Sequence, residues 1–174
     1  MKPTTLERLA AENVFEAIGK EWMLVTAGTA TSPNTMTASW GGLGWIWNKP
    51  VAFVFVRPER FTHHLIEENE RLTLSFYGHD EAMRKMLSFC GSASGRHCDK
   101  VKEAGLTPEA LPSGAVTFTQ ARLTLVGRKL FHTDFLPENF IDKEVLARWY
   151  NDRPGGSLHT MYIVEIEEVF EASL

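Results

Sequence analysis

Three polar segments of the chain place cations, hydroxyl groups and small residues where they could together bind a charged ligand. Residues 34–40 alternate small or hydroxylated side chains with apolar ones. Residues 57–62 (RPERFT) put two arginines and a threonine directly after the apolar run VAFVFV, where a helix is expected to begin. Residues 90–100 form a second polar, glycine-bearing segment that contains Arg96 and Lys100.

Each segment suits a different part of one ligand. A strand with small side chains lets a flat ring lie against the backbone, and its hydroxyl groups can bond to ring edges or to a polyol. A helix N-terminus suits a phosphate, which the arginines of the second segment and the cations of the third would neutralise. Ring, polyol and phosphate together describe flavin mononucleotide (FMN), our hypothesis from the residues. A structural interpretation stays open, because VAFVFV is typical of any buried strand and Arg57-Pro58 of many helix starts.

Trp40, Trp45 and Trp47 lie close together in and beside a Gly-rich connection, residues 41–50. Indole rings stack on flat π-systems, so a tryptophan here could form a wall beside the ligand ring. Each could instead pack in the core or contact a second subunit. The apolar character of this connection favours a homodimer, because exposed apolar patches usually meet a partner.

Motifs for other chemistries are absent. The sequence has no G-x-G-x-x-G, no P-loop and no G-x-S-x-G elbow, so a nicotinamide cofactor would have to dock on another surface, such as the flavin itself. The adjacent His63 and His64 point to different faces of a helix. Cys90, His97 and Cys98 lack a fourth ligand with zinc-finger spacing. We therefore predict no metal site and no catalytic side chain, and we expect Cys90 to pack as a small hydrophobic residue.

The composition indicates a folded chain and excludes several classes of protein. At 174 residues and 44% hydrophobic content, residues 1–174 are expected to form a single domain. A net charge of -4 argues against nucleic-acid binding. No apolar run is long enough to span a membrane, and residues 1–13 lack a signal-peptide core. Two cysteines do not make a disulfide framework, which fits a reducing compartment. Together these features lead us to expect a cytoplasmic protein without a membrane or nucleic-acid partner.

The hydrophobic patterns predict more strand than helix. Strands are expected at residues 21–27, 34–40, 51–56, 72–77, within 115–131 and at 160–172. Helices are expected at 5–11, 61–69, from Asp80, at 99–104 and at 143–150, with a further turn capped by Asn13 and closed by Gly19. Residues 90–100 and 41–50 are expected to be loops, 138–140 a turn, and 153–156 another turn. Because strands and helices do not alternate regularly, an antiparallel barrel with helical insertions fits better than a doubly wound sheet.

An ordered set of motifs resembles the flavin reductase-like FMN-binding split-barrel family, and in particular its flavoredoxin branch. The set is WMLVTAG, NTMTASWGG, WNKPVAFVFVRPERFT, LSFYG, SGRHCDK, GLTP, KLF and HTMYIVEI, which together span nearly the whole chain. The resemblance implies a mainly β fold, a six-stranded antiparallel Greek-key split barrel. It also implies a homodimer that holds FMN noncovalently near the subunit interface.

The resemblance further implies which residues bind the cofactor. The MTASW strand would lie along the ring edge and the ribityl chain, the R-P-x-R-x-T segment would contact phosphate and ribityl, and the SGR loop would help to close the site. The cofactor-binding residues predicted in this way are Asn34, Met36, Thr37, Ala38, Ser39, Trp40, Arg57, Arg60, Phe61, Thr62, Ser94, Gly95 and Lys100. His97 stands where the family's loop is expected to carry an acid, so no role is predicted for that position.

An oxidoreductase is the function expected from this resemblance. Electrons from NAD(P)H or from a redox protein partner would reach N5 of bound FMN, and the cofactor would carry the chemistry while the protein binds and orients it. Three versions stay open: a flavin reductase, a flavoredoxin-type electron carrier, and a flavin-binding module without turnover.

Overall fold

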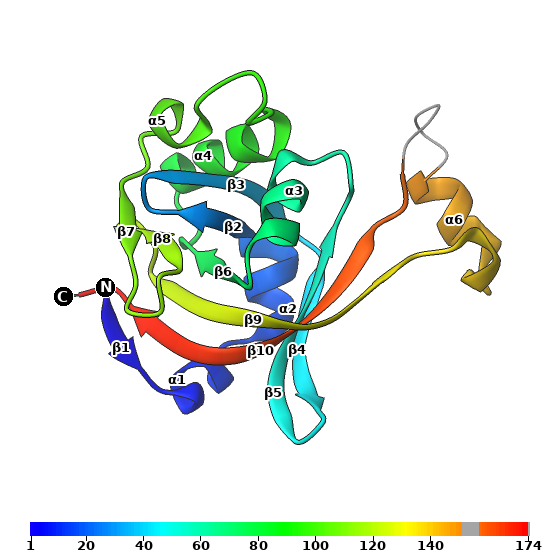
Figure 1. Ribbon diagram of the computed structural model, residues 1–174, viewed down its shortest axis with the longest axis horizontal. Coiled ribbons are helices and arrows are strands. Elements are labelled where there is room, and N and C mark those ends of the chain that lie inside the picture. Colours follow the sequence, from blue (N-terminus) through cyan, green and yellow to red (C-terminus); the bar gives the residue numbers. More distant parts are fainter. Residues whose placement is uncertain (151–156, 174) are drawn as a thin grey trace.

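Antiparallel strands account for most of the computed structural model, which describes residues 1–150 and 157–173. Eight strands form the main sheet in the order β3-β2-β6-β9-β10-β5-β4, with β1 added beside β10 (Figure 1). These strands are β1 (Lys2–Thr4), β2 (Met23–Thr29), β3 (Ser32–Ala38), β4 (Gly41–Ile46), β5 (Lys49–Val56), β6 (Arg71–Phe76), β9 (Leu123–Asp134) and β10 (Thr160–Glu171). A second sheet pairs β7 (Pro108–Ala110) with β8 (Val116–Phe118).

The predicted mainly β, antiparallel architecture with helical insertions is confirmed, but the prediction of a six-stranded barrel is wrong. The main sheet has eight strands, and within the described residues its end strands β3 and β4 do not pair with each other. One added strand is β1, and the other is β4, which the sequence suggested was a loop. Glycines weaken the strand pattern of β4, yet Gly41 and Gly44 are needed there because a Cβ on either would lie 3.0 Å from Phe53.

A tight hairpin joins β4 to β5. Trp47 and Asn48, the two residues between these strands, both have positive φ, at 53° and 58°. Positive φ at both central residues is what a type I′ turn requires, and the twist of that turn suits a two-residue hairpin. The hairpin leaves the side chains of Trp45 and Trp47 largely exposed, so these two tryptophans are not core residues.

The core lies between the faces of β2, β5, β6, β9 and β10. On β6, Leu72, Leu74 and Phe76 enter this core, which confirms the predicted alternation. The opposite face of β6 is also buried, because β8 covers it: Thr73 Oγ1 donates to the Val116 carbonyl at 2.7 Å, and Ser75 Oγ bonds to Thr117 Oγ1 at 3.0 Å. Each buried hydroxyl is therefore hydrogen-bonded.

Helices lie around the sheet at positions close to those predicted. They are α1 (Leu6–Ala10), α2 (Val14–Glu16), the π-helical turn η1 (Ala17–Glu21), α3 (Phe61–Glu68), α4 (Glu81–Ser92), α5 (Lys100–Glu103), the 3-10 turn η2 (Pro137–Asn139) and α6 (Lys143–Tyr150). The Asn13 side chain caps α2, and Asp80 caps α4 by accepting from the Met83 N–H at 2.9 Å. These predicted caps are confirmed.

Two predicted boundaries are wrong. Gly19 does not close its helical segment, because the π-helical turn continues to Glu21 and ends before Trp22, whose φ is 73°. The first part of the predicted loop 90–100 is helical, because α4 continues to Ser92, with Gly91 lying close to Thr37 of β3. The predicted turn at residues 153–156 lies outside the described residues.

An extension of the chain leaves the main body of the molecule. The ends of β9 and β10 run out from the sheet and carry η2 and α6, well away from β1 and both termini (Figure 1). We call residues 131–150 the arm. Its exposed apolar side chains are Phe131, Leu136, Ile141, Val145 and Trp149. In the part of the chain that is described, no helix has the length and apolar character that crossing a membrane would require.

Close packing between β9 and β10 gives a test of the fold. A Cβ on Gly127 would lie 2.5 Å from Val164 Cγ2, and Val164 is fully buried. Gly127→Ala should therefore lower the free energy of unfolding by about 1–3 kcal/mol, as overpacking does. Gly19→Ala is the matched control, because nothing lies within 4 Å of a Cβ there. Thermal and urea unfolding of both variants should separate them, and equal stability would contradict the described β9–β10 contact.

Candidate functional site

A cavity of about 520 Å³ opens where the end of β3, the start of α3 and the segment after α4 meet. This volume is within the range of small-molecule sites. All of the residues predicted to bind a cofactor, except Asn34, line it. The sequence had suggested that three separate segments serve one ligand, and the structure brings those segments together. Lining residues that the prediction missed are Phe55, Glu59, Gly91, Ser92, Ala93 and His159.

Strand β3 forms one wall of the cavity. Met36 and Ala38 turn their side chains into the core, so the strand presents a shallow surface. Thr37 faces the other way, and its hydroxyl donates to the Leu87 carbonyl of α4 at 2.5 Å. That proton is therefore already used within the protein. Ser39 and Trp40 follow the strand and extend the wall.

Helix α3 begins at the cavity without a side-chain cap. Its N-cap residue is Arg60, which makes no capping side-chain hydrogen bond. The first N–H groups of a helix have no partner within the helix, and they carry the positive end of its dipole. Phe61 and Thr62, in this first turn, both line the cavity. An anion placed here would meet N–H donors and a positive potential.

Three cations of the cavity are held by main-chain carbonyls in the last turns of two other helices. Lys100 Nζ donates to the Cys90 carbonyl at 2.9 Å, and Arg60 donates to the Gly91 carbonyl at 2.7 Å, both in the last turn of α4. Arg57 donates to the Trp149 carbonyl of α6 at 2.8 Å. Cations satisfy the carbonyls that a helix leaves unpaired at its C-terminus, where the dipole is negative. The sequence could not indicate these partners, because main-chain carbonyls carry no residue-specific signal and those of Arg57 and Arg60 lie 92 and 31 residues away.

Lys100 is the most deeply buried of the three cations. Burial and, to a smaller extent, the neighbouring Arg60 charge together lower its pKa to about 8. A buried ammonium group next to another cation is poorly stabilised unless an anion joins it. The cavity therefore has the electrostatic character of an anion site. Arg96, which the sequence also suggested for this role, does not line the cavity; its guanidinium bonds to the Glu59 carbonyl at 2.6 Å.

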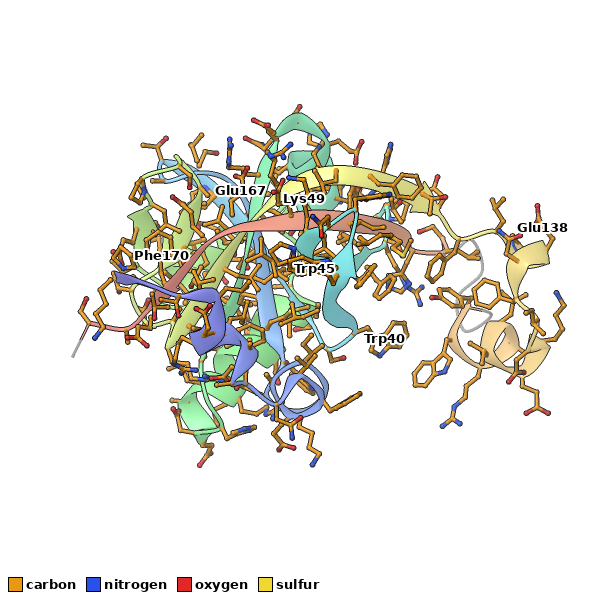
Figure 2. The ribbon with its side chains drawn as sticks, turned by 90° about the horizontal axis from the view of Figure 1, so that it is seen from below. Trp40, Trp45, Lys49, Glu138, Glu167 and Phe170 are labelled. Atoms are coloured by element: carbon orange, nitrogen blue, oxygen red, sulfur yellow. The ribbon has the colours of Figure 1, made fainter. Side chains whose placement is uncertain are left out.

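The opposite side of the cavity is aromatic and close to the arm. Trp40 lies between the β4–β5 hairpin and α6 (Figure 2), with its ring centroid 5.3 Å from those of both Trp149 and His159. His159 Nδ1 lies 2.9 Å from Tyr150 Oη. Burial and the positive charge of Arg57 lower the pKa of His159 to about 4, so its imidazole is neutral at pH 7. His159 is in the HTMYIVEI motif, but its spacing gave no signal of a role in a site.

Other candidate residues take structural positions. Cys90 is fully buried, and burial raises the pKa of its thiol to about 11, which confirms that it packs as a small hydrophobic residue. Asn34 is buried next to the cavity and hydrogen-bonds to Thr62. Glu59 places a carboxylate at the cavity, where it is 3.9 Å from Arg57 and accepts a hydrogen bond from Ser157. Among the described residues, no group of three or more His, Cys, Asp or Glu side chains could hold a metal ion.

Comparisons with known proteins identify one family. The chain matches the family model of the flavin reductase like domain over residues 15–173. No curated protein sequence matches it. Among solved structures, flavoredoxin of Desulfovibrio vulgaris (Miyazaki F) has a TM-score of 0.67 at 22% identity, covering 99% of this chain and 78% of that chain.

Two further solved structures share the fold. The FMN-binding protein from Thermus thermophilus with bound p-hydroxybenzaldehyde has a TM-score of 0.65 at 21% identity, over 87% of this chain and 71% of that one. An NADH:FAD oxidoreductase of Streptomyces globisporus C-1027, in complex with NAD and FAD fragments, has a TM-score of 0.60 at 15% identity, over 87% and 74%. At these identities the likeness shows a common fold.

The lowered pKa of Lys100 gives a pH-dependent prediction for a phosphorylated ligand such as FMN. A phosphate bound beside Lys100 would raise its pKa, so the protonated form binds more tightly and affinity falls as the free protein loses this proton. With a pKa of about 8, the affinity for FMN relative to riboflavin should fall by about tenfold between pH 7 and 9. Titrations monitored by flavin fluorescence measure both affinities.

Riboflavin, which lacks the phosphate, is the internal control for this pH effect, and Lys100→Met should abolish the slope. An unchanged slope in Lys100→Met, or the same slope for riboflavin, would show that the phosphate does not sit beside Lys100.

Proposed function

Because the chain belongs to the flavin reductase-like domain family, we propose that it binds FMN noncovalently in this cavity and passes electrons through it. The observation that carries the proposal is the convergence of Arg57, Arg60 and Lys100 with the uncapped start of α3 on one cavity of about 520 Å³. Lys100 is buried and both arginines are half-buried. Gathering like charges in such a place favours an anionic ligand. FMN supplies one phosphate and a redox-active ring.

The residues of the cavity fit the chemical parts of FMN. Arg60, Lys100 and Thr62, with the first N–H groups of α3, would hold the phosphate by charge-assisted hydrogen bonds. The ring would lie towards β3 and Trp40, where small side chains and an indole offer a flat apolar surface. Glu59 would stay outside the phosphate contact, since its carboxylate repels that group. One group of cations, Arg57, Arg60 and Lys100, lines this cavity, which suits the single phosphate of FMN better than the two phosphates of FAD.

In the reaction, the protein would bind and orient the flavin and exclude water from it. Bound FMN accepts and releases electrons at its ring, so no acid–base pair from the protein is required. Neutral His159, buried against Trp40 and Tyr150, adds an uncharged wall. Trp40 and Phe55 would limit access of water to that side of the cavity. We place the single domain over residues 1–174, as the sequence suggests.

We propose a flavin reductase that takes electrons from NADH or NADPH as the first candidate. The fold shared with an NADH:FAD oxidoreductase supports this choice, and the fold shared with flavoredoxins supports the alternative of an electron carrier with a protein donor. The nicotinamide would dock against the flavin, since the sequence carries no Rossmann fingerprint. Both candidates use the same cavity, so they differ in the donor and not in the cofactor.

The purified protein should carry FMN, or take it up on reconstitution, and the bound flavin should bleach when NADH or NADPH is added without oxygen. Chromatography of the extracted cofactor identifies it, and stopped-flow absorbance follows the reduction. Bleaching only by a reduced protein donor would support the carrier. If no donor bleaches the flavin, the protein is a flavin-binding module and the proposed electron passage is contradicted. If the extract contains FAD or no flavin at all, the assignment of FMN as the cofactor is contradicted.

We also propose that two copies of the chain associate through the arm and the β4–β5 hairpin. Ile141 is completely exposed, and Trp45 and Trp47 are 65% and 54% exposed. Large apolar side chains gathered on protruding elements are typical of an interface. Because Trp149 of the arm contacts Trp40, such an interface would lie beside the cavity.

Sedimentation equilibrium at micromolar concentration should give the mass of a dimer. Ile141→Glu should shift the mass towards the monomer, because a charge would be buried without a partner. Phe15→Glu is the matched control: Phe15 is 90% exposed but belongs to α2, outside the arm, and should leave the mass unchanged. A monomeric wild-type protein, or equal effects of both variants, would reject this interface.

A further inference from the structure

Asn34 is the one predicted cofactor-binding residue that lies behind the cavity wall. Its side chain is buried, with 5% exposure, and comes from β3. The amide Nδ2 donates to Thr62 Oγ1 at 2.7 Å, joining β3 to the first turn of α3. Thr62 is itself 1% exposed and lines the cavity. Asn34 can therefore affect a ligand only through the hydroxyl that it holds.

The direction of this hydrogen bond is fixed by its surroundings. The same Nδ2 lies 3.5 Å from the Thr35 carbonyl oxygen, which can only accept. The other end of the amide, Oδ1, faces Gly95 so closely that a Cβ there would lie 2.1 Å away. The amide thus turns its N–H group towards Thr62 and its oxygen towards the segment after α4.

The hydroxyl of Thr62 is left with its own proton unused. A threonine hydroxyl has one O–H donor and two acceptor lone pairs. Asn34 occupies a lone pair, and among the described residues no acceptor is hydrogen-bonded to the Thr62 O–H. A buried donor without a partner is costly, so the site is built for an acceptor that comes from elsewhere.

We propose that Asn34 is a positioning residue that sets the polarity of Thr62, so that Thr62 presents a donor, not lone pairs, to the phosphate of the ligand. This inference rests on the proposed binding of FMN in the cavity. A phosphate oxygen only accepts in its ionised form, so it matches an O–H directed at it and would be repelled by lone pairs. The hydroxyl then adds to the N–H donors at the start of α3.

Gly95 helps to hold the Asn34 amide in this orientation. Its missing side chain lets the segment after α4 close against Asn34 and Phe61, since a Cβ would also lie 2.9 Å from Phe61 Cδ1. The amide is held between β3, α3 and this segment, and reversing it would turn its oxygen towards the Thr35 carbonyl oxygen, which only accepts. Strand β3, the start of α3 and the segment after α4 are distant in sequence, yet together they fix how the Asn34 amide is oriented.

A double-mutant cycle tests the proposal. Asn34→Asp keeps the size of the side chain, but an ionised carboxylate only accepts, so it takes the Thr62 proton and turns the lone pairs towards the ligand. It also adds a negative charge, whose effect is independent of Thr62. Adding Asn34→Asp to the Thr62→Val protein measures that charge effect alone, because this protein has no Thr62 hydroxyl to reorient. The quantity to measure is the affinity for FMN relative to riboflavin in all four proteins, by fluorescence titration.

We expect Asn34→Asp to lower this ratio about tenfold more when Thr62 is present than in the Thr62→Val protein. An equal loss in both backgrounds would overturn the polarity role, because Asn34 would then act by charge or packing alone. Equal losses for FMN and riboflavin would also overturn it, since the phosphate would not be near Thr62. If the wild-type protein binds no flavin, the proposed function itself fails, which is a distinct result.

A second pair of variants covers the case in which Asn34→Asp does not fold, as judged by circular dichroism. Asn34→Ala frees the Thr62 hydroxyl to rotate without removing its proton, so the ratio should fall by only about two- to threefold. In the Thr62→Val background the same change should have no effect on the ratio. A loss of equal size in both backgrounds would overturn the proposal.

Discussion

The carbonyl groups at helix C-termini are the constraint on which the cavity depends. Two carbonyls in the last turn of α4 hold Lys100 and Arg60, and one in the last turn of α6 holds Arg57. Without its acceptor, the buried Lys100 beside Arg60 would lose its proton more readily, because burial and a like charge both disfavour the ammonium form. The pKa of Lys100 is lowered mainly by its burial and also by the charge of Arg60. The free carbonyls at the helix ends need hydrogen-bond donors, and the cations need acceptors, so each satisfies the other at the cavity.

This arrangement gathers positive charge at the cavity. Glu59, which also lines the cavity, places a carboxylate 3.9 Å from Arg57, and that carboxylate accepts a hydrogen bond from Ser157. The uncapped start of α3 adds further positive potential. A protein that keeps buried cations in a cavity gives up stability at that point. Such a cost is typical of functional sites, where electrostatics serve a ligand and not the fold.

The arm couples the cavity to a distant part of the chain. Arg57 bonds to the Trp149 carbonyl, Trp40 contacts the Trp149 ring, and Tyr150 bonds to His159. The last turn of α6 is therefore in contact with a cation, an aromatic wall and a buried histidine of one site. The arm also carries exposed apolar residues, on which a second molecule could pack. Such a molecule would contact the same helix, α6, whose Trp149 carbonyl holds Arg57.

The sequence by itself predicted much of the local structure and which segments meet at one cavity. Alternation predicted β6, cap residues predicted the starts of α2 and α4, and three polar segments pointed to one anionic ligand. These features depend on neighbouring residues, so periodicity and capping chemistry are sufficient to find them. The resemblance of ordered motifs also identified the family.

Tertiary structure alone decided the features that depend on residues far apart. Strand β4 pairs with β5 although glycine disfavours strands locally, and with β1 it takes the main sheet beyond the six predicted strands. Gly19 likewise sits within a π-helical turn that no local signal predicts. Asn34 was grouped with ligand-contacting residues, yet the fold places it behind Thr62. The partners of Arg57, Arg60 and Thr62 lie 28 or more residues away, and a local sequence pattern carries no record of such contacts.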